Sequence, residues 1–339
     1  MYPRRHQSSS TRVPVLLVAL LVFGLGVSIP TPVAGQEAAP VSRDEFNQWL
    51  EDISNWGRWG ADDELGTLNL ITDESRRAAA GLVEDGVSVS MALEANTQRD
   101  ALNANPFQHT LSTSRFTEHE VAGDVYSVQY HGFAHSHVDG LPHFAHDGQM
   151  YNGFPVSGLR EDGAERLGVH NMENGIVTRG VLIDMPRHRG VDFLEPGTAI
   201  TVEDLEGWEQ ATGITVGSGD VLLIRTGRWE AVRQLGQWNF VERAAGSHAS
   251  VAKWLKERDV AVIGSDGVSD VMPSGIEGLA NPLHELVIVG LGMPILDNLD
   301  LDTVAREANT RERWEFMFVG APLKVRGGTG SPLNPLAIF

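Results

Sequence analysis

Short apolar runs alternate with polar stretches along most of the chain, and their spacing changes between helical and strand-like periods. A period near 3.6 residues predicts amphipathic helices, and four segments show it: 43–53, 72–83, 202–212 and 248–259. Runs rich in β-branched residues and bounded by Gly or Pro predict strands, chiefly over 87–94, 179–185, 219–227 and 260–264. Thr72 and Thr201 are placed to cap two of the helices.

The order of these segments indicates a mixed architecture. The helix predicted over 248–259 leads directly into the apolar run 260–264, which ends at Ser265 and Asp266. A helix followed by a buried strand with polar residues at its end is half of an α/β unit. Mixed segments continue to the C-terminus. We therefore expect a single α/β or α+β domain with a sheet core.

The first 35 residues differ in kind from the rest. Three arginines precede an apolar run that ends in a small-residue pattern, with Gly35 before Gln36. This order is typical of a secretory signal peptide, although the run is also near the lower length limit of an uncleaved membrane anchor. We predict a signal peptide over 1–35, a linker over 36–42 and a folded domain over 43–339. The chain is then periplasmic or secreted, with membrane anchoring as the alternative.

The composition narrows the class of function. Of the 339 residues, 42% are hydrophobic, which is enough for a globular core. The formal net charge of −19 disfavours nucleic acid and anionic membranes as partners, so we expect a small-molecule substrate and no stable membrane association after cleavage. The chain has no cysteine, which excludes disulfides, thiolate ligands and a cysteine nucleophile. His, Asp, Glu and water remain for any chemistry.

Five of the 12 histidines lie in the segment 131–148, HGFAHSHVDGLPHFAHDG. If the β-like segment before them continues as a strand, His135, His137 and Asp139 point to one face. Gly140 and Pro142 then turn the chain, so that His143 folds back toward that face. Imidazole and carboxylate together suit Zn²⁺ or Mn²⁺. The alternative is a set of histidines that are hydrogen-bonded for structural reasons.

The segment HVDGLPHF resembles the signature of the metal-dependent cyclase family, which includes kynurenine formamidase and isatin hydrolase. The family pattern is H-x-G-T-H-x-D-x-P-x-H, and further similar segments cover nearly all of the chain after residue 50. The resemblance implies a swivelling β/β/α-type single domain with a mixed sheet core, one or two metal ions per chain, and a dimer or tetramer. It also implies that His137, Asp139 and His143 are metal ligands.

The resemblance implies two more ligands near the start of the last third of the chain. His284 takes the first position, and Asp297 stands where the family has a glutamate. An aspartate reaches about one methylene less, so a bridging role for Asp297 requires a small backbone shift. Glu285 is a less favoured substitute because it adjoins His284.

Other residues of the histidine segment receive weaker assignments. His146 matches the general acid/base of kynurenine formamidases, and an exposed loop histidine is the alternative. His131 and His135 have no ligand role in the family and are interpreted as supporting groups or substrate contacts. Trp56 and Trp59 resemble residues that wall the family's pocket, and ordinary core packing explains them equally well. The family's opening H-x-G-T is changed here, with Phe133 at the place of its first histidine.

Together these features predict an exported metal-dependent hydrolase that cleaves a small amide, lactam or ester with activated water. No G-x-S-x-G segment is present, which argues against serine hydrolysis. Two alternatives remain open. One is kynurenine formamidase activity, and the other is a metal-binding or scavenging protein without turnover.

Overall fold

The computed structural model describes residues 41–339, and the predicted signal peptide and most of the predicted linker lie outside this range. A nine-stranded sheet forms the centre of this part of the chain. In spatial order its strands are β1 (Ser88–Ser90), β15 (Leu336–Ile338), β13 (Glu315–Gly320), β7 (Ile176–Asp184), β9 (Val221–Arg225), β11 (Val262–Ser265), β12 (Ile295–Asp297), β4 (His137–Asp139) and β14 (Gly330–Pro332). The strands β7, β9, β11 and β12 are parallel, and antiparallel strands complete both edges. The expected mixed sheet core is thereby confirmed.

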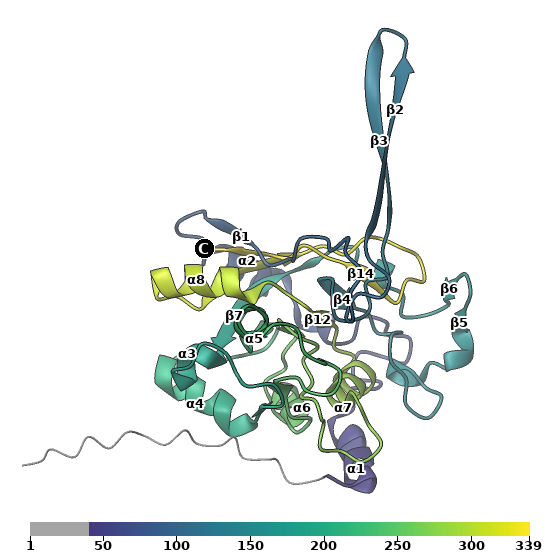
Figure 1. Ribbon diagram of the computed structural model, residues 1–339. Coiled ribbons are helices and arrows are strands. Elements are labelled where there is room, and N and C mark those ends of the chain that lie inside the picture. Colours follow the sequence, from purple (N-terminus) through teal and green to yellow (C-terminus); the bar gives the residue numbers. More distant parts are fainter. Residues whose placement is uncertain (1–40) are drawn as a thin grey trace, which may run out of the picture. The chain divides into compact units, whose positions relative to one another are not determined.

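Helices cover both faces of this sheet (Figure 1). Their bounds are α1 (Arg43–Ile53), α2 (Asp73–Ala80), α3 (Met185–Arg189), α4 (Val202–Thr212), α5 (Arg228–Leu235), α6 (Val251–Glu257), α7 (Pro282–His284) and α8 (Leu301–Arg311). A π-helix over Glu285–Leu291 follows α7 directly. No helix in residues 41–339 is long and apolar enough to cross a bilayer.

Alternating side chains of the parallel strands supply two hydrophobic cores. Leu222 and Ile224 of β9 face one core, which contains buried residues of α1, α4, α6 and the π-helix. Val221 and Leu223 face the other core, which contains buried residues of α8. A strand that is buried on both faces is apolar at successive positions, which is why residues 221–224 form a continuous hydrophobic run.

Helix ends follow the predicted capping signals. Thr72 and Ser75 exchange side-chain-to-backbone hydrogen bonds at the start of α2, with distances of 3.1 and 2.9 Å. At the start of α4 the carboxylate of Asp204 accepts the N–H of Thr201 at 2.8 Å. These contacts satisfy N–H groups that have no partner inside a helix.

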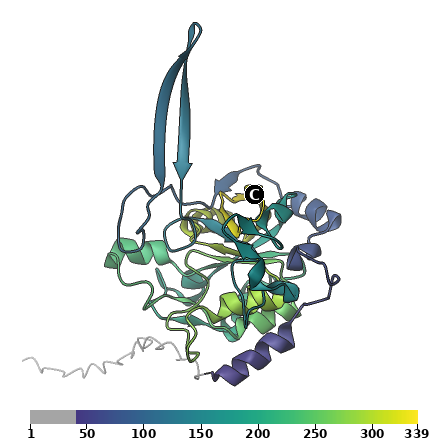
Figure 2. The same cartoon turned by 90° about the vertical axis from the view of Figure 1, so that its right-hand side faces the viewer.

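Outside the main sheet, β2 (Gln108–Phe116) and β3 (His119–Ser127) form a long hairpin. The hairpin extends away from the body of the domain in both views (Figures 1 and 2). Two further small sheets pair β5 (Leu159–Arg160) with β6 (Gly163–Ala164), and β8 (Ala199–Ile200) with β10 (Gly246–Ser247).

The histidine segment does not continue β3 as one strand. β3 ends at Ser127 and β4 begins at His137, with a turn over 131–134 between them. The side chain of Asn298 holds this loop, because its amide donates to the carbonyls of Gly132 at 2.7 Å and His135 at 3.3 Å. His135 therefore precedes β4, whereas His137 and Asp139 lie on it.

Candidate metal centre

Two neighbouring strands bring histidine and acidic side chains together. β4 pairs antiparallel with β12, and their register sets His137 opposite Asp297. Asp139 projects from the same face of β4 as His137, because side chains alternate along a strand. Ligand atoms of His137, Asp139 and Asp297 all lie within 4.8 Å of one another, and all three residues are buried.

Asp139 is the residue that joins the cluster. Its carboxylate has four imidazole nitrogens nearby: Nδ1 of His131 at 2.7 Å, and Nε2 of His137 at 3.2 Å, of His284 at 3.6 Å and of His143 at 3.7 Å. The Asp139 residue is only 1% exposed. A carboxylate buried this deeply requires cations or hydrogen-bond donors around it.

Hydrogen bonds fix which nitrogen of His137 and His284 faces the carboxylates. Nδ1 of His137 lies 2.8 Å from the carbonyl oxygen of His135, and Nδ1 of His284 lies 2.5 Å from a carboxylate oxygen of Asp270. Both partners accept hydrogen bonds, so each Nδ1 carries a proton. The Nε2 atoms of both rings therefore face the carboxylates, which is how histidines are held for metal binding.

Asp270 is a residue that the sequence did not single out. It is 1% exposed and also accepts the backbone N–H of Leu283 at 2.7 Å. It lies 14 residues before His284 in the segment between β11 and α7, outside any helix or strand, so no periodic sequence signal pointed to it. Its carboxylate is hydrogen-bonded to Nδ1 of His284 and so fixes the orientation of that ring.

His131 and His143 form a second group of donors with Asp139. Their rings stack with centroids 3.7 Å apart and an interplanar angle of 4°. Nε2 of His131 lies 2.9 Å from the hydroxyl of Thr329, which leaves Nδ1 facing Asp139. His131, which was given only a supporting role, is therefore as close to the cluster as the predicted ligand His143.

The electrostatics of the cluster favour positive charge. Burial lowers the pKa of His284, but the carboxylates of Asp297, Asp139 and Asp270 outweigh burial and raise this pKa well above its usual range. Burial would raise the pKa of Asp139, but His131, His137 and His284 hold it well below the usual value. Burial raises the pKa of Asp297. In the absence of a cation, protons on the imidazoles therefore balance the carboxylates.

His146 does not contact this cluster in the described part of the chain. Its Nδ1 is hydrogen-bonded to Glu285, the residue that follows His284 and begins the π-helix. Its Nε2 lies 3.4 Å from the exposed carboxylate of Asp147. Glu285 is thus hydrogen-bonded to His146 and lies outside the cluster. Of the two acidic candidates, Asp297 is the one that lies beside His137 and Asp139.

The remaining predicted pocket residues are more dispersed. His135 is buried, its Nε2 has no hydrogen-bond partner, and burial together with the charge of His137 lowers its pKa. Trp56 is 38% exposed and donates to the carbonyl of Val289 at 2.7 Å. Trp59 stacks against the guanidinium of Arg58. These contacts of the two tryptophans do not involve the histidine cluster.

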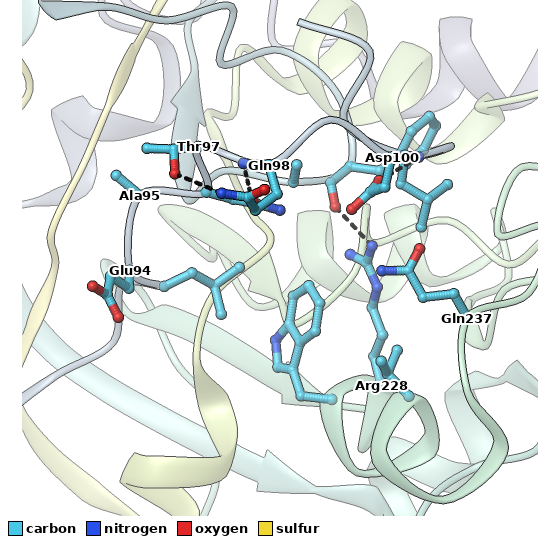
Figure 3. A pocket seen from close by; sticks show the side chains of 14 residues that line it. Glu94, Ala95, Thr97, Gln98, Asp100, Arg228 and Gln237 are labelled. Atoms are coloured by element: carbon cyan, nitrogen blue, oxygen red, sulfur yellow. Dashed lines mark hydrogen bonds between the residues drawn. The ribbon is translucent and has the colours of Figure 1, made fainter. Parts of the chain in front are cut away.

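A cavity of about 470 Å³ adjoins the loop between His131 and His135, because Phe133 and Ala134 of this loop line it. Figure 3 shows this cavity with Arg228 among its lining residues. Phe133 and Arg228 line it, and Arg228 donates to the carbonyl of Phe133 at 2.7 Å. Arg228 also donates to the side chain of Asn298, the residue after Asp297, at 2.6 Å. Burial lowers the pKa of Arg228 to about 9. This cavity wall is thus hydrogen-bonded to the backbone that positions the cluster.

The side chains of the cluster fit a divalent cation. Nδ1 of His131 and Oδ1 of Asp139 lie 2.7 Å apart, but they are not aligned for a hydrogen bond and each is buried without a partner. Imidazole nitrogen and carboxylate oxygen are ligands that Zn²⁺ and Mn²⁺ accept. Asp139 belongs both to the group with His131 and His143 and to the group with His137 and Asp297. Its carboxylate could therefore be a ligand of one ion or of two.

Solved structures of known proteins have a fold similar to that of this chain. A structure described as a novel cyclase is 29% identical in sequence, with a TM-score of 0.77, and the alignment covers 86% of this chain and 99% of the cyclase chain. An isatin hydrolase bound to the product analogue thioisatinate is 19% identical, with a TM-score of 0.52, and covers 79% of this chain and 99% of its own. Isatin hydrolase A from Ralstonia solanacearum is 22% identical, with a TM-score of 0.52, over 77% of this chain and 93% of its own. A search among curated proteins gives no match.

The sequence profile of the family described as putative cyclase matches residues 87–270. This range includes β4, the loop before it and the parallel strands β7, β9 and β11. The match extends over more than half of the chain, so the chain belongs to the putative cyclase family.

Proposed function

We propose that this protein is a metal-dependent hydrolase that cleaves a small amide, lactam or ester. The observation that carries the proposal is the paired orientation of His137 and His284, whose Nε2 atoms both face buried carboxylates. Two solved structures of similar fold are described as isatin hydrolases, which supports carbonyl chemistry at this site.

The chain offers six residues to hold Zn²⁺ or Mn²⁺: His131, His137, Asp139, His143, His284 and Asp297. When bound, such an ion supplies Lewis acidity, which activates water for attack on a carbonyl group. Asp270 and the carbonyl of His135 orient two of the imidazoles. The buried surroundings of the cluster strengthen these electrostatic interactions.

We assign proton transfer to His146. Its hydrogen bond to Glu285 places a proton on Nδ1 and fixes the ring, which is the way a carboxylate supports a general acid/base histidine. His146 then carries a proton to the leaving nitrogen or oxygen. Glu285 is the residue next to His284 in the chain, which links the His146 pair to the metal cluster through the backbone.

The proposal is tested with protein loaded with Zn²⁺ or Mn²⁺ and a panel of isatin, N-formylkynurenine, simple lactams and aryl esters. Wild-type protein should hydrolyse at least one of them, and hydrolysis of N-formylkynurenine alone would favour the formamidase alternative. His146→Gln should keep its metal and lose about 10²- to 10⁴-fold in kcat. His137→Ala should lose bound metal by elemental analysis.

Two outcomes contradict the proposal. Full metal occupancy in His137→Ala removes the cluster as the metal site. Metal-loaded protein that hydrolyses none of the panel, while retaining its ion tightly, favours the scavenging alternative.

We further propose that the protein is exported, on the pattern of residues 1–35. The N-terminal residue of the protein recovered from cells measures this directly. A chain that begins near Gln36 and is found outside the cytoplasm supports export, and an intact N-terminus in the membrane fraction supports the anchor instead.

A further inference from the structure

A buried cation, Arg228, forms part of the wall of the 470 Å³ cavity beside the loop that carries Phe133. The Arg228 residue is only 3% exposed. Its guanidinium packs against two aromatic rings, 4.2 Å from the ring centroid of Trp229 and 3.8 Å from that of Phe240. Such contacts use the flat face of a guanidinium and leave its N–H groups for polar partners.

The hydrogen-bond partners of Arg228 in residues 41–339 include no carboxylate. Its terminal nitrogens donate to the carbonyl of Phe133 at 2.7 Å, the side-chain oxygen of Asn298 at 2.6 Å and the backbone carbonyl of Asp266 at 3.4 Å. Its Nε is buried without a partner. The carboxylate of Asp266 accepts backbone N–H groups at the start of α5 instead. Because a buried charge is normally paired with an opposite charge, the guanidinium lacks a counter-ion.

The rest of the cavity wall is suited to a small organic ligand. Figure 3 shows the side-chain amide of Gln237 pointing toward the guanidinium of Arg228. Apolar side chains supply further parts of the wall: Leu93, Leu102, Phe133 and Val232. The exposed Glu94 and the half-buried Asp100 also line the cavity. A volume of this size, with apolar walls and a few polar groups, is typical of small-molecule sites.

We propose that this cavity binds a small monocarboxylate with an apolar body. A carboxylate accepts charge-assisted hydrogen bonds from a guanidinium, so it supplies the counter-ion that Arg228 lacks. The apolar body packs against side chains such as Leu93 and Leu102. Dicarboxylates and phosphate fit less well, because their additional charge is repelled by Glu94 and Asp100.

The proposed site is separate from the metal centre. None of the 14 residues that line the cavity is one of the six candidate metal ligands. Arg228 nevertheless supports the metal loop, because Asn298 accepts from Arg228 and donates to the carbonyl of His135. The same carbonyl lies 2.8 Å from Nδ1 of His137. The inference concerns ligand binding and does not depend on the proposed hydrolase activity.

Calorimetric titration of the metal-loaded protein with benzoate tests the site. Benzamide has the same shape without the charge, and isophthalate has a second carboxylate, so both should bind at least about 10-fold more weakly than benzoate. A carboxylate can also bind a metal ion, and His137→Ala separates the two sites. This variant should keep its benzoate affinity. Loss of benzoate binding in His137→Ala, or equal affinities of the wild type for benzoate and benzamide, overturns the inference.

A matched pair of variants tests the role of the guanidinium while leaving Arg228 in place. Gln237→Glu adds a carboxylate that pairs with the guanidinium and repels the ligand, so benzoate affinity should fall at least about 10-fold. Asn239→Asp adds the same charge two residues away, at an exposed position that does not line the cavity, and should bind benzoate like the wild type. Unchanged affinity in Gln237→Glu, or an equal loss in both variants, contradicts the assigned site.

Arg228→Gln removes the cation itself and should abolish measurable benzoate binding. This substitution also removes a hydrogen bond to Asn298, so its thermal unfolding is measured beside the titration. A folded Arg228→Gln protein that binds benzoate as tightly as the wild type overturns the inference. If Arg228→Gln does not fold, the comparison of Gln237→Glu with Asn239→Asp decides.

Discussion

Asp270→Asn tests the view that a buried carboxylate prepares His284 for a metal ion. In the wild type both oxygens of Asp270 accept hydrogen bonds, from Leu283 N–H at 2.7 Å and from His284 Nδ1 at 2.5 Å. Asparagine has nearly the same shape but only one accepting oxygen. If that oxygen still accepts the hydrogen bond from the N–H of Leu283, the amide nitrogen faces Nδ1 of His284 and donates to it. The imidazole proton then moves to Nε2, the atom that faces Asp139 and Asp297.

The expected size of the effect follows from this change of tautomer. A protonated Nε2 has no lone pair for a cation, so metal binding must first reverse the tautomer and break the new hydrogen bond. Loss of such a supporting partner typically weakens metal affinity about 10- to 100-fold, or roughly 1.4 to 2.7 kcal/mol. The backbone N–H of His284 lies 3.3 Å from the Asp270 oxygen that faces Nδ1. It loses this acceptor when asparagine places an amide nitrogen there, which costs about 1 kcal/mol of stability.

Chelator competition measures the metal affinity, and urea unfolding of metal-free protein measures the stability. Asp220→Asn is the control, because Asp220 is also buried, accepts the N–H of Gly217 and a guanidinium from Arg179, and precedes β9 at the opposite end of the sheet. It should lose stability and keep its metal affinity. Unchanged metal affinity in Asp270→Asn, or an equal loss in Asp220→Asn, would refute the tautomer argument.

Two further predictions concern stability. Burial lowers the pKa of His143 from 6.5 to about 4, so the unfolded chain binds more protons between these values and metal-free protein loses on the order of 3 kcal/mol as the pH falls through this interval. His143→Gln should lose correspondingly less in urea unfolding, and parallel pH curves would contradict the assignment. Gly66→Ala should cost at least about 3 kcal/mol in the same assay, because Gly66 has φ +56° and a Cβ there would lie 1.9 Å from the carbonyl oxygen of Gly292. A loss below 1 kcal/mol would contradict this expectation, because it would mean that the backbone at Gly292 moves away from the new methyl group at little cost.

The parts of the fold that could be predicted from sequence are those with local signals. The helix predicted over 43–53 matches α1 residue for residue, and the helix predicted over 202–212 matches α4. Both begin where a polar side chain accepts an N–H that the helix itself leaves unpaired. The strand pattern at 219–227 likewise contains β9, because burial on both faces makes the run apolar. These signals need no knowledge of distant contacts.

The loop before β4 had no such signal. Residues 125–139 are rich in β-branched and aromatic residues and suggested one continuous strand. The break at 128–136 depends on distant partners, since Asn298 holds the carbonyls of Gly132 and His135. The strand period still placed His137 and Asp139 on one face correctly, because both lie after the break.

In the candidate site, too, the features with local sequence signals could be predicted and those that depend on distant contacts could not. His137 and Asp139 could be paired from their spacing alone, but their proximity to Asp297 depends on the pairing of β4 with β12, and only the family resemblance pointed to it. His131 and Asp270 were missed as parts of the cluster, because a turn and a long loop bring them in. The functional roles of these residues stay predictions, and their geometry is what the structure adds.

One physical argument connects the separate features of the cluster. Asp139 and Asp297 are both buried, and two carboxylates in one low-dielectric site repel unless positive charge lies between them. Nearby imidazoles can supply that charge as protons, which is why the pKa of His284 is raised. The carbonyl of His135 and the carboxylate of Asp270, however, each hold one proton on the far nitrogen and leave Nε2 directed inward. A second proton at Nε2 and a metal ion therefore compete for the same lone pair, and the ion has the advantage that a single charge centre can contact several lone pairs at once. The site is thus arranged so that a divalent cation replaces protons, with Asp139 as the carboxylate common to both donor groups.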